Sequence, residues 1–359
     1  VNHYTASRRL RSDDAYTPGG IAGFRPDYAT VVYTQILKKL YPSSSVLIGG
    51  IEASMRRLMH YDYWRDRLEP SILISSGADL LIYGMAERAV AQLAGRLLAG
   101  ERMKEIHDLP QSAFTVSSDT VLPALPGVRD KALRPCHEAL ASRKAYAENF
   151  VLFEKTSNSI KPVRLTEQCG DVTVVVNPPL PPATEAETDA VYDLLFNYAP
   201  HPRYKKKGAI PAWEMIKFSV NIHRGCFGGC SFCAIAAHQG KFISSRSEAS
   251  VMREVERISR MDGFKGYLSD LGGPSANMYK MAGRERERCM RCGRPSCIWP
   301  SVCDNLETSH RELISLYRKV NSLPYIKKAF IGSGVRYDLL IKDYNKAAGN
   351  AEEQYLREL

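Results

Sequence analysis

The stretch HRGCFGGCSFCAI spans residues 223–235 and places Cys226, Cys230 and Cys233 in a C-x₃-C-x₂-C spacing. Three thiolates on one short loop can bind three irons of a cubic iron–sulfur cluster, which leaves the fourth iron open to a substrate or cofactor. Glycines stand between these cysteines and let the backbone wrap closely around a bulky group. A zinc loop and three unrelated buried thiols are the alternatives. The spacing, the glycines and the aromatic Phe232 together favour the cluster.

Seven of the nine cysteines lie within residues 226–303, which suits metal binding in a reducing cytoplasm. The other two, Cys136 and Cys169, stand alone and are expected to be structural or incidental. The downstream group has the spacing C-x₂-C-x₄-C-x₅-C and consists of Cys289, Cys292, Cys297 and Cys303. Four thiolates so close in sequence can hold tetrahedral zinc or a second iron–sulfur cluster. We favour an auxiliary cluster, with zinc as the alternative.

Six strings along nearly the whole chain carry a family resemblance: NHYTASRRLRSDDAYTPGG (2–20), GGIEASMRRLMHYDYW (49–64), HRGCFGGCSFCAI (223–235), HQGKFISSRSE (238–248), SDLGGPSANMY (269–279) and FIGSGVRYDLL (330–340). Together they resemble the YgiQ-type radical SAM proteins. The resemblance implies a [4Fe–4S] cluster whose open iron chelates S-adenosylmethionine (SAM). It also implies reductive cleavage of SAM to a 5′-deoxyadenosyl radical and an electron donor such as flavodoxin or ferredoxin. It does not imply a substrate.

The resemblance further implies where SAM is held. Residues 215–221 are expected to form the first strand of a partial (β/α) barrel and to lead into the cysteine loop. The next strand ends at Gly272, Gly273 and Pro274. Radical SAM proteins carry a Gly-Gly-Glu-like motif at the equivalent position, and its backbone holds the methionine amino group of SAM. Because Pro274 stands at the third position, backbone carbonyls, helped by Asp270, are expected to do this here.

A third barrel strand is predicted over 326–331, followed by small residues that leave space for a ligand at the strand's carboxyl end. Ser333 and Arg336 are therefore candidates for contact with SAM or substrate. Asp338 is expected to cap the next helix. By resemblance alone, Arg246 is a candidate partner for the SAM carboxylate, and an exposed salt bridge is its alternative.

The first part of the chain alternates predicted helices and strands: a helix over 29–40, strands over 46–48 and 79–84, and a helix over 87–98. This alternation is typical of a parallel α/β sheet. GGIEAS and YGMAE resemble the second half of a cobalamin-binding-type Rossmann domain. Cobalamin is therefore possible as a cofactor but is not predicted.

The fold class is expected to be α/β, with a partial Rossmann-like (cobalamin-binding-type) domain followed by a truncated radical SAM partial (β/α) barrel. The first domain is assigned to residues 1–115, a linker and lead-in region to 116–210, and the radical SAM domain to 211–359. NPPLPPA (177–183) reads as a proline-stiffened linker. Because the chain begins with Val1 and its motifs begin at once, we expect an internal fragment of a longer protein.

Residues 56–67, RRLMHYDYWRDR, combine four arginines and one histidine with three aromatic residues. Arginine forks and aromatic faces suit an interdomain or anion-contacting surface. A charged helix whose aromatic side chains pack inward is the alternative, and the sequence does not decide between them.

The bulk properties are those of a globular protein: 359 residues, 44% hydrophobic and 25% charged. No apolar run is long enough for a membrane span and no signal peptide opens the chain, so a cytoplasmic location is expected. The net charge of +10 allows a nucleic-acid partner. The scatter of the basic residues instead favours a solvated basic surface.

A radical SAM enzyme with an unknown substrate is the leading prediction. A cobalamin-dependent radical SAM methyltransferase is the rival within enzymes. A non-catalytic iron–sulfur or zinc module is the rival of another class.

Overall fold

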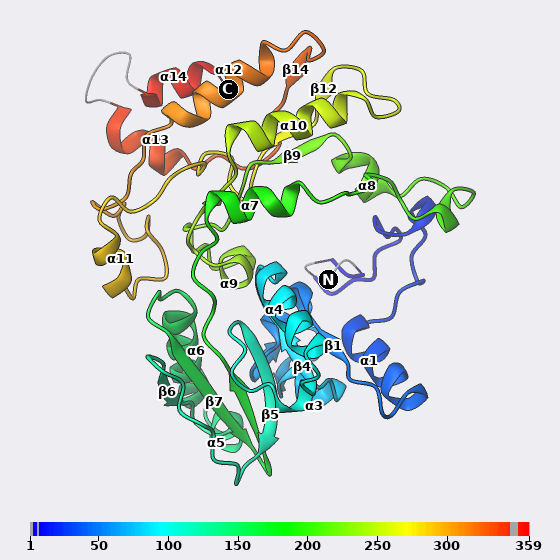
Figure 1. Cartoon of the computed structure of the whole chain (residues 1–359), viewed down its shortest axis with the longest axis vertical. Helices are drawn as coiled ribbons and strands as arrows, with labels where there is room; N and C mark the ends of the chain where they lie inside the picture. Colours follow the sequence, from blue (N-terminus) through cyan, green and yellow to red (C-terminus); the bar gives the residue numbers. More distant parts are fainter. Residues whose placement is uncertain (1–2, 6, 345–350, 359) are drawn as a thin grey trace.

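Six strands from the first half of the chain form one mixed sheet in the computed structural model, which describes residues 3–5, 7–344 and 351–358 (Figure 1). Val1, on which the expectation of a fragment rests, lies outside the described residues. In spatial order the strands are β1 (Leu47–Ile48), β4 (Leu80–Ile82), β5 (Ser112–Ser117), β8 (Val172–Val176), β7 (Val163–Cys169) and β6 (Arg129–Ala132).

The directions of these strands correct the expectation of a parallel, Rossmann-like sheet. Only β1–β4 and β6–β7 pair in parallel, and the three central pairings are antiparallel. The tight turn at Gly170-Asp171 explains one of them. It pairs Cys169 with Val172, and a connection this short can join only antiparallel strands. Gly170 adopts a φ of 66°, which glycine tolerates best.

Helices cover both faces of the sheet because its strands alternate their side chains. Leu81 points into a core shared with α1, α3 and α6, whereas Leu80 and Ile82 pack against α4 on the other face. The helices of this half are α1 (Ala29–Leu40), α2 (Gly50–Met55), α3 (Ile72–Ser76), α4 (Glu87–Leu98), α5 (Cys136–Ala141), α6 (Arg143–Ser157) and α7 (Glu185–Tyr192). The helices predicted over 29–40 and 87–98 are confirmed with those bounds.

The sheet continues well beyond residue 115, because β6, β7 and β8 all lie within the predicted linker and lead-in region. Most of 116–176 is therefore part of the first α/β unit and is not a linker. The proline-rich segment 177–183 follows β8 directly and leads to α7, without helix or strand of its own.

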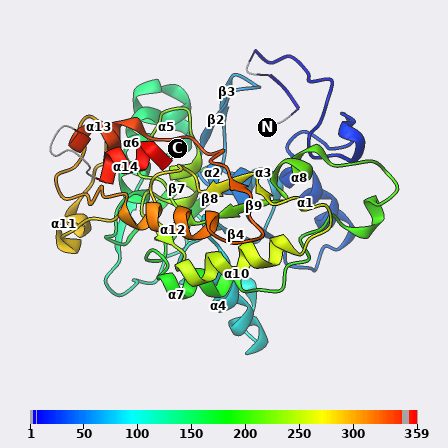
Figure 2. The same ribbon diagram turned by 90° about the horizontal axis from the view of Figure 1, so that it is seen from above.

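The second half contains four short strands that pair in parallel, two by two. β9 (Ser219–Asn221) pairs with β13 (Asp270–Gly272), and β12 (Tyr267–Leu268) pairs with β14 (Lys328–Ala329). Helix α10 (Glu248–Ser259) connects β9 to β12, and α12 (Arg311–Asn321) connects β13 to β14. The two helices lie side by side (Figure 2).

This strand–helix alternation is the one expected of a (β/α) barrel segment. The first strand is shorter than predicted, because helix α8 (Pro211–Ile216) occupies the beginning of 215–221. The remaining elements of this half are β10 (His223–Arg224), α9 (Ile235–Gln239), β11 (Ser244–Ser245), α11 (Arg286–Arg291), α13 (Tyr337–Tyr344) and α14 (Ala351–Glu358). In the part of the chain that the structure describes, no helix has the length and apolar character of a membrane span.

Residues 56–67 form a hairpin, so the helical alternative for this segment is wrong. Strand β2 (His60–Asp62) pairs with β3 (Arg67–Glu69) in antiparallel fashion. Arg56 and Arg65 stack on the ring of Tyr28 from the preceding segment. Arg57 points into the protein and is fully buried.

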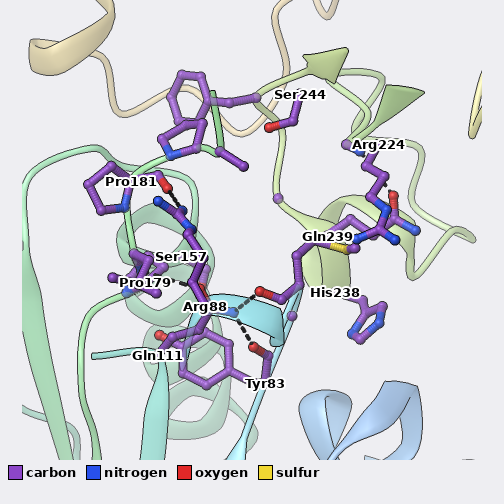
Figure 3. A pocket seen from close by; sticks show the side chains of 18 of the residues that line it. Tyr83, Arg88, Gln111, Ser157, Pro179, Pro181, Arg224, His238, Gln239 and Ser244 are labelled. Atoms are coloured by element: carbon purple, nitrogen blue, oxygen red, sulfur yellow. Dashed lines mark hydrogen bonds between the residues drawn. The ribbon is translucent and has the colours of Figure 1, made fainter. Parts of the chain in front are cut away.

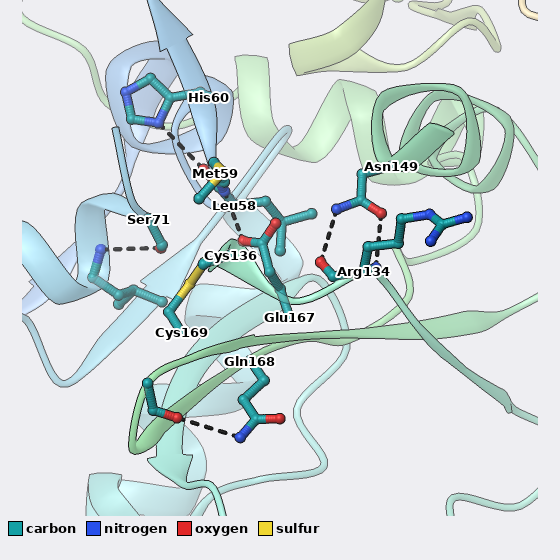
Figure 4. Close-up of a disulfide and its surroundings, with 12 residues drawn as sticks. Leu58, Met59, His60, Ser71, Arg134, Cys136, Asn149, Glu167, Gln168 and Cys169 are labelled. Atoms are coloured by element: carbon teal, nitrogen blue, oxygen red, sulfur yellow. Dashed lines mark hydrogen bonds between the residues drawn. A yellow bond between two sulfur atoms is a disulfide. The ribbon is translucent and has the colours of Figure 1, made fainter. Parts of the chain in front are cut away.

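Cys136 and Cys169 are joined in a disulfide that links the start of α5 to the end of β7 (Figure 4). Glu167 lies beside them, and its Oε2 accepts a hydrogen bond from the Met59 N–H at 2.7 Å. Burial raises the pKa of the Glu167 carboxyl to about 7, although the hydrogen bond from Met59 opposes the rise. The disulfide therefore has a structural role in the six-stranded sheet unit, and the buried Glu167 carboxyl lies next to it.

The raised pKa of Glu167 predicts that the free energy of unfolding falls as the pH rises from about 4.5 to 7. In this window the folded protein binds the proton more tightly than the unfolded chain does. The shift corresponds to about 3 kcal/mol. Urea unfolding at pH 5 and pH 8 measures it, and Glu167→Gln should remove most of the difference. Glu148→Gln, at an exposed carboxylate on α6, is the control and should leave it intact. If Glu167→Gln lost as much stability between pH 5 and pH 8 as the wild type does, the prediction would be contradicted.

Candidate functional site

The first cysteine loop lies between strand β10 and helix α9. The loop is tied at its base, because the Gly225 N–H donates to Gln239 Oε1 at 2.9 Å and the Cys226 N–H donates to Gly240 O at 3.1 Å. Gly225 has a φ of 85°, and a Cβ there would lie 2.1 Å from Phe242 O. Glycine is therefore required at this position for the loop to close.

The predicted thiols come together around Gly228. A Cβ on Gly228 would lie 3.3 Å from Cys226 Sγ and 3.7 Å from Cys230 Sγ. Burial raises the pKa of the Cys226 thiol, and the neighbouring Cys233 and Cys230 raise it further. Phe232, which supported the prediction, points out to solvent. The structure thus brings the three thiols into one half-buried group.

Arg336 reaches this group from the loop between β14 and α13. Its Nη1 lies 3.0 Å from Cys230 Sγ, and its guanidinium pairs with Asp338. The Asn277 side chain fixes the Arg336 backbone by accepting from its N–H at 2.7 Å and donating to its carbonyl at 3.0 Å. Asn277 is fully buried and was not predicted as a site residue, although it stands in the SANMY string. Asp338 is the second residue of α13 and is not its cap, contrary to expectation.

The Gly272-Gly273 turn lies next to the cysteine loop, because β13 pairs with β9 in register. Both glycines are sterically required. A Cβ on Gly272 would lie 2.8 Å from Ser333 Oγ, and one on Gly273 would lie 2.5 Å from the ring of His223. His223 is buried, and its Nε2 is 2.8 Å from Ser275 O, so the ring cannot move away freely. The close packing of Gly272 against Ser333 and of Gly273 against His223 is therefore a property of the protein alone and does not depend on a ligand at this turn.

Asp270 binds the neighbouring loop of the protein. Its Oδ2 accepts from Ser333 Oγ at 2.6 Å, and its Oδ1 accepts from the Gly332 N–H at 2.8 Å. Asp270 and Ser333 are thus brought together as a pair that joins the second strand to the third. Pro274 follows the glycines without a backbone N–H.

Arg246 does not reach the cysteine loop. It is fully buried and pairs with Glu254, and its guanidinium also donates to Asn221 O and Ser250 O. Its role is to hold α10 against β9. The alternative of an exposed salt bridge is also wrong, because the ion pair is an interior one.

The second cysteine group packs directly against the first loop. Ser296 Oγ donates to Phe227 O and Gly228 O, and the Cys297 N–H donates to Phe227 O at 3.1 Å. Burial raises the pKa of the Cys297 thiol to about 11. The other three cysteines of the group raise it further, and Lys241 opposes the rise. The structure therefore brings all seven predicted cysteines into two adjoining groups.

Lys241 is a buried cation beside the second group and was missed in the sequence. It is 2% exposed, and its Nζ donates to Arg294 O at 2.6 Å and lies 3.9 Å from Cys292 Sγ. No carboxylate pairs with it among the described residues. A buried ammonium next to sulfur favours negative charge on those sulfurs. In the sequence, the lysine of the HQGK string (238–241), which follows the first cysteine loop, was the feature that could have indicated a cation near the cysteines.

The close fit of Gly273 predicts that Gly273→Ala lowers the free energy of unfolding by about 1–3 kcal/mol, because the methyl group would overlap the buried His223 ring. Gly334→Ala is the matched control, since a Cβ at Gly334 meets open space. Urea unfolding of both variants measures the difference. Equal stability of the two would show that the ring can move aside.

Comparison with known proteins identifies the family. The family model described as Radical SAM N-terminal matches residues 1–219. A UPF0313 protein of Porphyromonas gingivalis is 54% identical over 360 residues, which cover 100% of this chain and 56% of the relative. One of Bacteroides thetaiotaomicron is 51% identical over 371 residues, covering 100% and 59%. The chain thus spans a little over half the length of these curated relatives.

Among solved structures, the radical SAM methyltransferase TsrM from Kitasatospora setae, with cobalamin and a [4Fe–4S] cluster bound, aligns with 64% of this chain and 31% of its own. The identity is 14% and the TM-score 0.33. The family relationship therefore rests on the sequence matches, and they confirm the predicted radical SAM resemblance. The chain belongs to the UPF0313 family and carries a radical SAM N-terminal domain.

Proposed function

We propose that the chain carries the iron–sulfur and SAM-binding site of a radical SAM enzyme. The observation that carries this proposal is the meeting of Cys226, Cys230 and Arg336 around Gly228, with Cys233 on the same loop. Three thiols with a cation against one sulfur suit a site for a negatively charged thiolate-bound group.

The C-x₃-C-x₂-C spacing of the first loop supports a cluster, and the sulfurs do not form the tight triplet of a preformed single-ion site. Three sulfurs around one zinc ion would lie about 4 Å apart. In the part of the chain that the structure describes, no three sulfurs of either cysteine group lie within 4.8 Å of one another. Wider spacing is what a cubic cluster needs, because each thiolate binds a different iron. For the second group we keep the auxiliary cluster as the proposal and zinc as its alternative.

Cys226, Cys230 and Cys233 would hold the [4Fe–4S] cluster. When bound, the cluster and SAM together supply a 5′-deoxyadenosyl radical through reductive cleavage of SAM. The contribution of Arg336 would be a hydrogen bond from its Nη1 to Cys230 Sγ, which would favour the reduced, more negative form of the site, while Asp338 pairs with the rest of the guanidinium.

The turn at Gly272-Gly273 would offer backbone carbonyls to the methionine amino group of SAM. Pro274 adds no N–H, and the Asp270 carboxylate already accepts hydrogen bonds from Gly332 and Ser333. Asp270 therefore positions the loop that bears Ser333, and its help to SAM is indirect. Arg336 would contact the cluster side of the site. Flavodoxin or ferredoxin in the cytoplasm would supply the electron.

The cysteine assignment predicts that Cys226→Ser, Cys230→Ser and Cys233→Ser each abolish cluster binding and formation of 5′-deoxyadenosine. The assay uses the complete protein, reconstituted with iron and sulfide, reduced and mixed with SAM, with mass spectrometry for the product. Cys169→Ser is the control, because Cys169 lies on the six-stranded sheet; it should keep both properties.

A reduced wild-type cluster that forms no 5′-deoxyadenosine and whose EPR spectrum does not respond to SAM would refute the enzyme proposal. It would leave the non-catalytic iron–sulfur module. Cobalamin retained on the purified complete protein would instead favour the cobalamin-dependent methyltransferase.

For the second group we predict that Cys292→Ser combined with Cys297→Ser lowers the iron content by about half, because one of two [4Fe–4S] clusters is lost. Iron, zinc and acid-labile sulfide are measured in the same preparations. One zinc per chain in the wild type, lost in the double variant while the iron content stays constant, would show that the group is a zinc site.

A further inference from the structure

A cavity of about 290 Å³ lies between the six-stranded sheet unit and helix α9 (Figure 3). Tyr83 and Gln111 line it from the sheet side, and His238 and Gln239 from the α9 side. The proline-rich segment 179–182 forms another wall. The volume is at the lower end of the range for small-molecule pockets.

Arg57, from the arginine-rich segment 56–67, also lines this cavity. It is 2% exposed, and its guanidinium stacks between the rings of Tyr83 and Phe153 at 4.3 and 4.4 Å. It donates to two neutral oxygens, Ser54 O and Ser157 Oγ, and its Nε has no hydrogen-bond partner. Burial lowers the pKa of this guanidinium to about 10, so the group is still a cation at neutral pH.

The other fully buried arginines show what is missing at Arg57. Arg164 pairs with Asp130 through two hydrogen bonds of 2.7 and 2.8 Å, and Arg246 pairs with Glu254. No carboxylate pairs with Arg57 in the described residues. A buried cation without a counter-ion is costly, which makes this position a natural place for an anion from outside the chain.

The carboxylates on the cavity wall are already engaged. Glu187 pairs with Arg88 at 3.2 Å, and Glu87 pairs with Arg224 at 2.5 Å. Burial lowers the pKa of His238, and the nearby Arg57 lowers it further, so this ring adds no charge near neutral pH. The wall therefore carries one uncompensated positive charge, at Arg57.

We propose that this cavity binds a small organic anion. Its phosphate or carboxylate group pairs with Arg57, and its apolar body lies against the proline segment 179–182. A charge-assisted hydrogen bond to a guanidinium suits both kinds of anionic group. The Ser157 side chain on the same wall offers a neutral polar contact, whereas Gln111 is held in place by its hydrogen bonds to Tyr83 O, Met85 O and the Leu180 N–H.

The site is independent of the proposed radical chemistry but adjoins its loop. Gln239 and Gly240 line the cavity, and both accept hydrogen bonds from the base of the first cysteine loop. A ligand in the cavity therefore contacts the segment that anchors that loop.

The test measures binding of phenyl phosphate and phenylacetate to the complete protein by titration calorimetry at constant ionic strength. Benzyl alcohol is the neutral probe. Wild type and Arg134→Met, which removes an exposed arginine that does not line the cavity, should bind one of the two anions saturably. Arg57→Met should weaken that binding about tenfold or more, the effect of losing one charge-assisted hydrogen bond.

Ala183→Phe provides a second variant in case Arg57→Met fails to fold, because it fills the cavity and leaves Arg57 in place. It should weaken binding as strongly. The anion that binds identifies the head group as phosphate or carboxylate. The proposal is overturned if neither anion binds the wild type, if benzyl alcohol binds as tightly as the anions, or if both cavity variants bind as the wild type does. None of these outcomes depends on SAM cleavage, so failure here leaves the proposed function untouched.

Discussion

The parallel pairing of β9 with β13 is the constraint on which the candidate site depends. Its register sets Ser219 against Asp270 and Asn221 against Gly272. The chain leaves β9 toward the cysteine loop and leaves β13 toward the glycine turn, so both arrive at the same end of the sheet. A slip of one residue would reverse the side-chain directions along the strand and separate Asp270 from Ser333.

Local patterns in the sequence predicted the helices well and the strand directions poorly. Helices α1 and α4 have apolar residues at helical spacing, a property of the segment itself. Strand direction depends on a partner far along the chain, and β5 pairs with β8 almost sixty residues later. The antiparallel centre of the sheet was therefore not visible in the alternation of helices and strands. The hairpin turn at Gly170 was the one local signal.

The site residues likewise divide into those that local sequence patterns predict and those that depend on contacts with distant parts of the chain. Cysteine spacing is a local property, so both groups were found, whereas the contact between the two loops through Ser296 was not. The prediction for Arg246 is wrong, although its partners stand close to it in the sequence. Ser250 and Glu254 follow it at intervals of four residues, and both hydrogen-bond to its guanidinium. That helical spacing could have indicated an interior network instead of an exposed pair.

The buried cations of this molecule differ in the kind of group that can neutralise their charge, and there are three kinds. Arg164 and Arg246 have carboxylates of the chain as partners, which makes them structural. Lys241 has a carbonyl and a cysteine sulfur, so its counter-charge would come from thiolates once they are deprotonated by a bound metal. Arg57 has two neutral oxygens, two aromatic faces and a cavity. Because nothing in the described chain neutralises it, the charge of Arg57 is best understood as half of an interaction whose other half is a ligand.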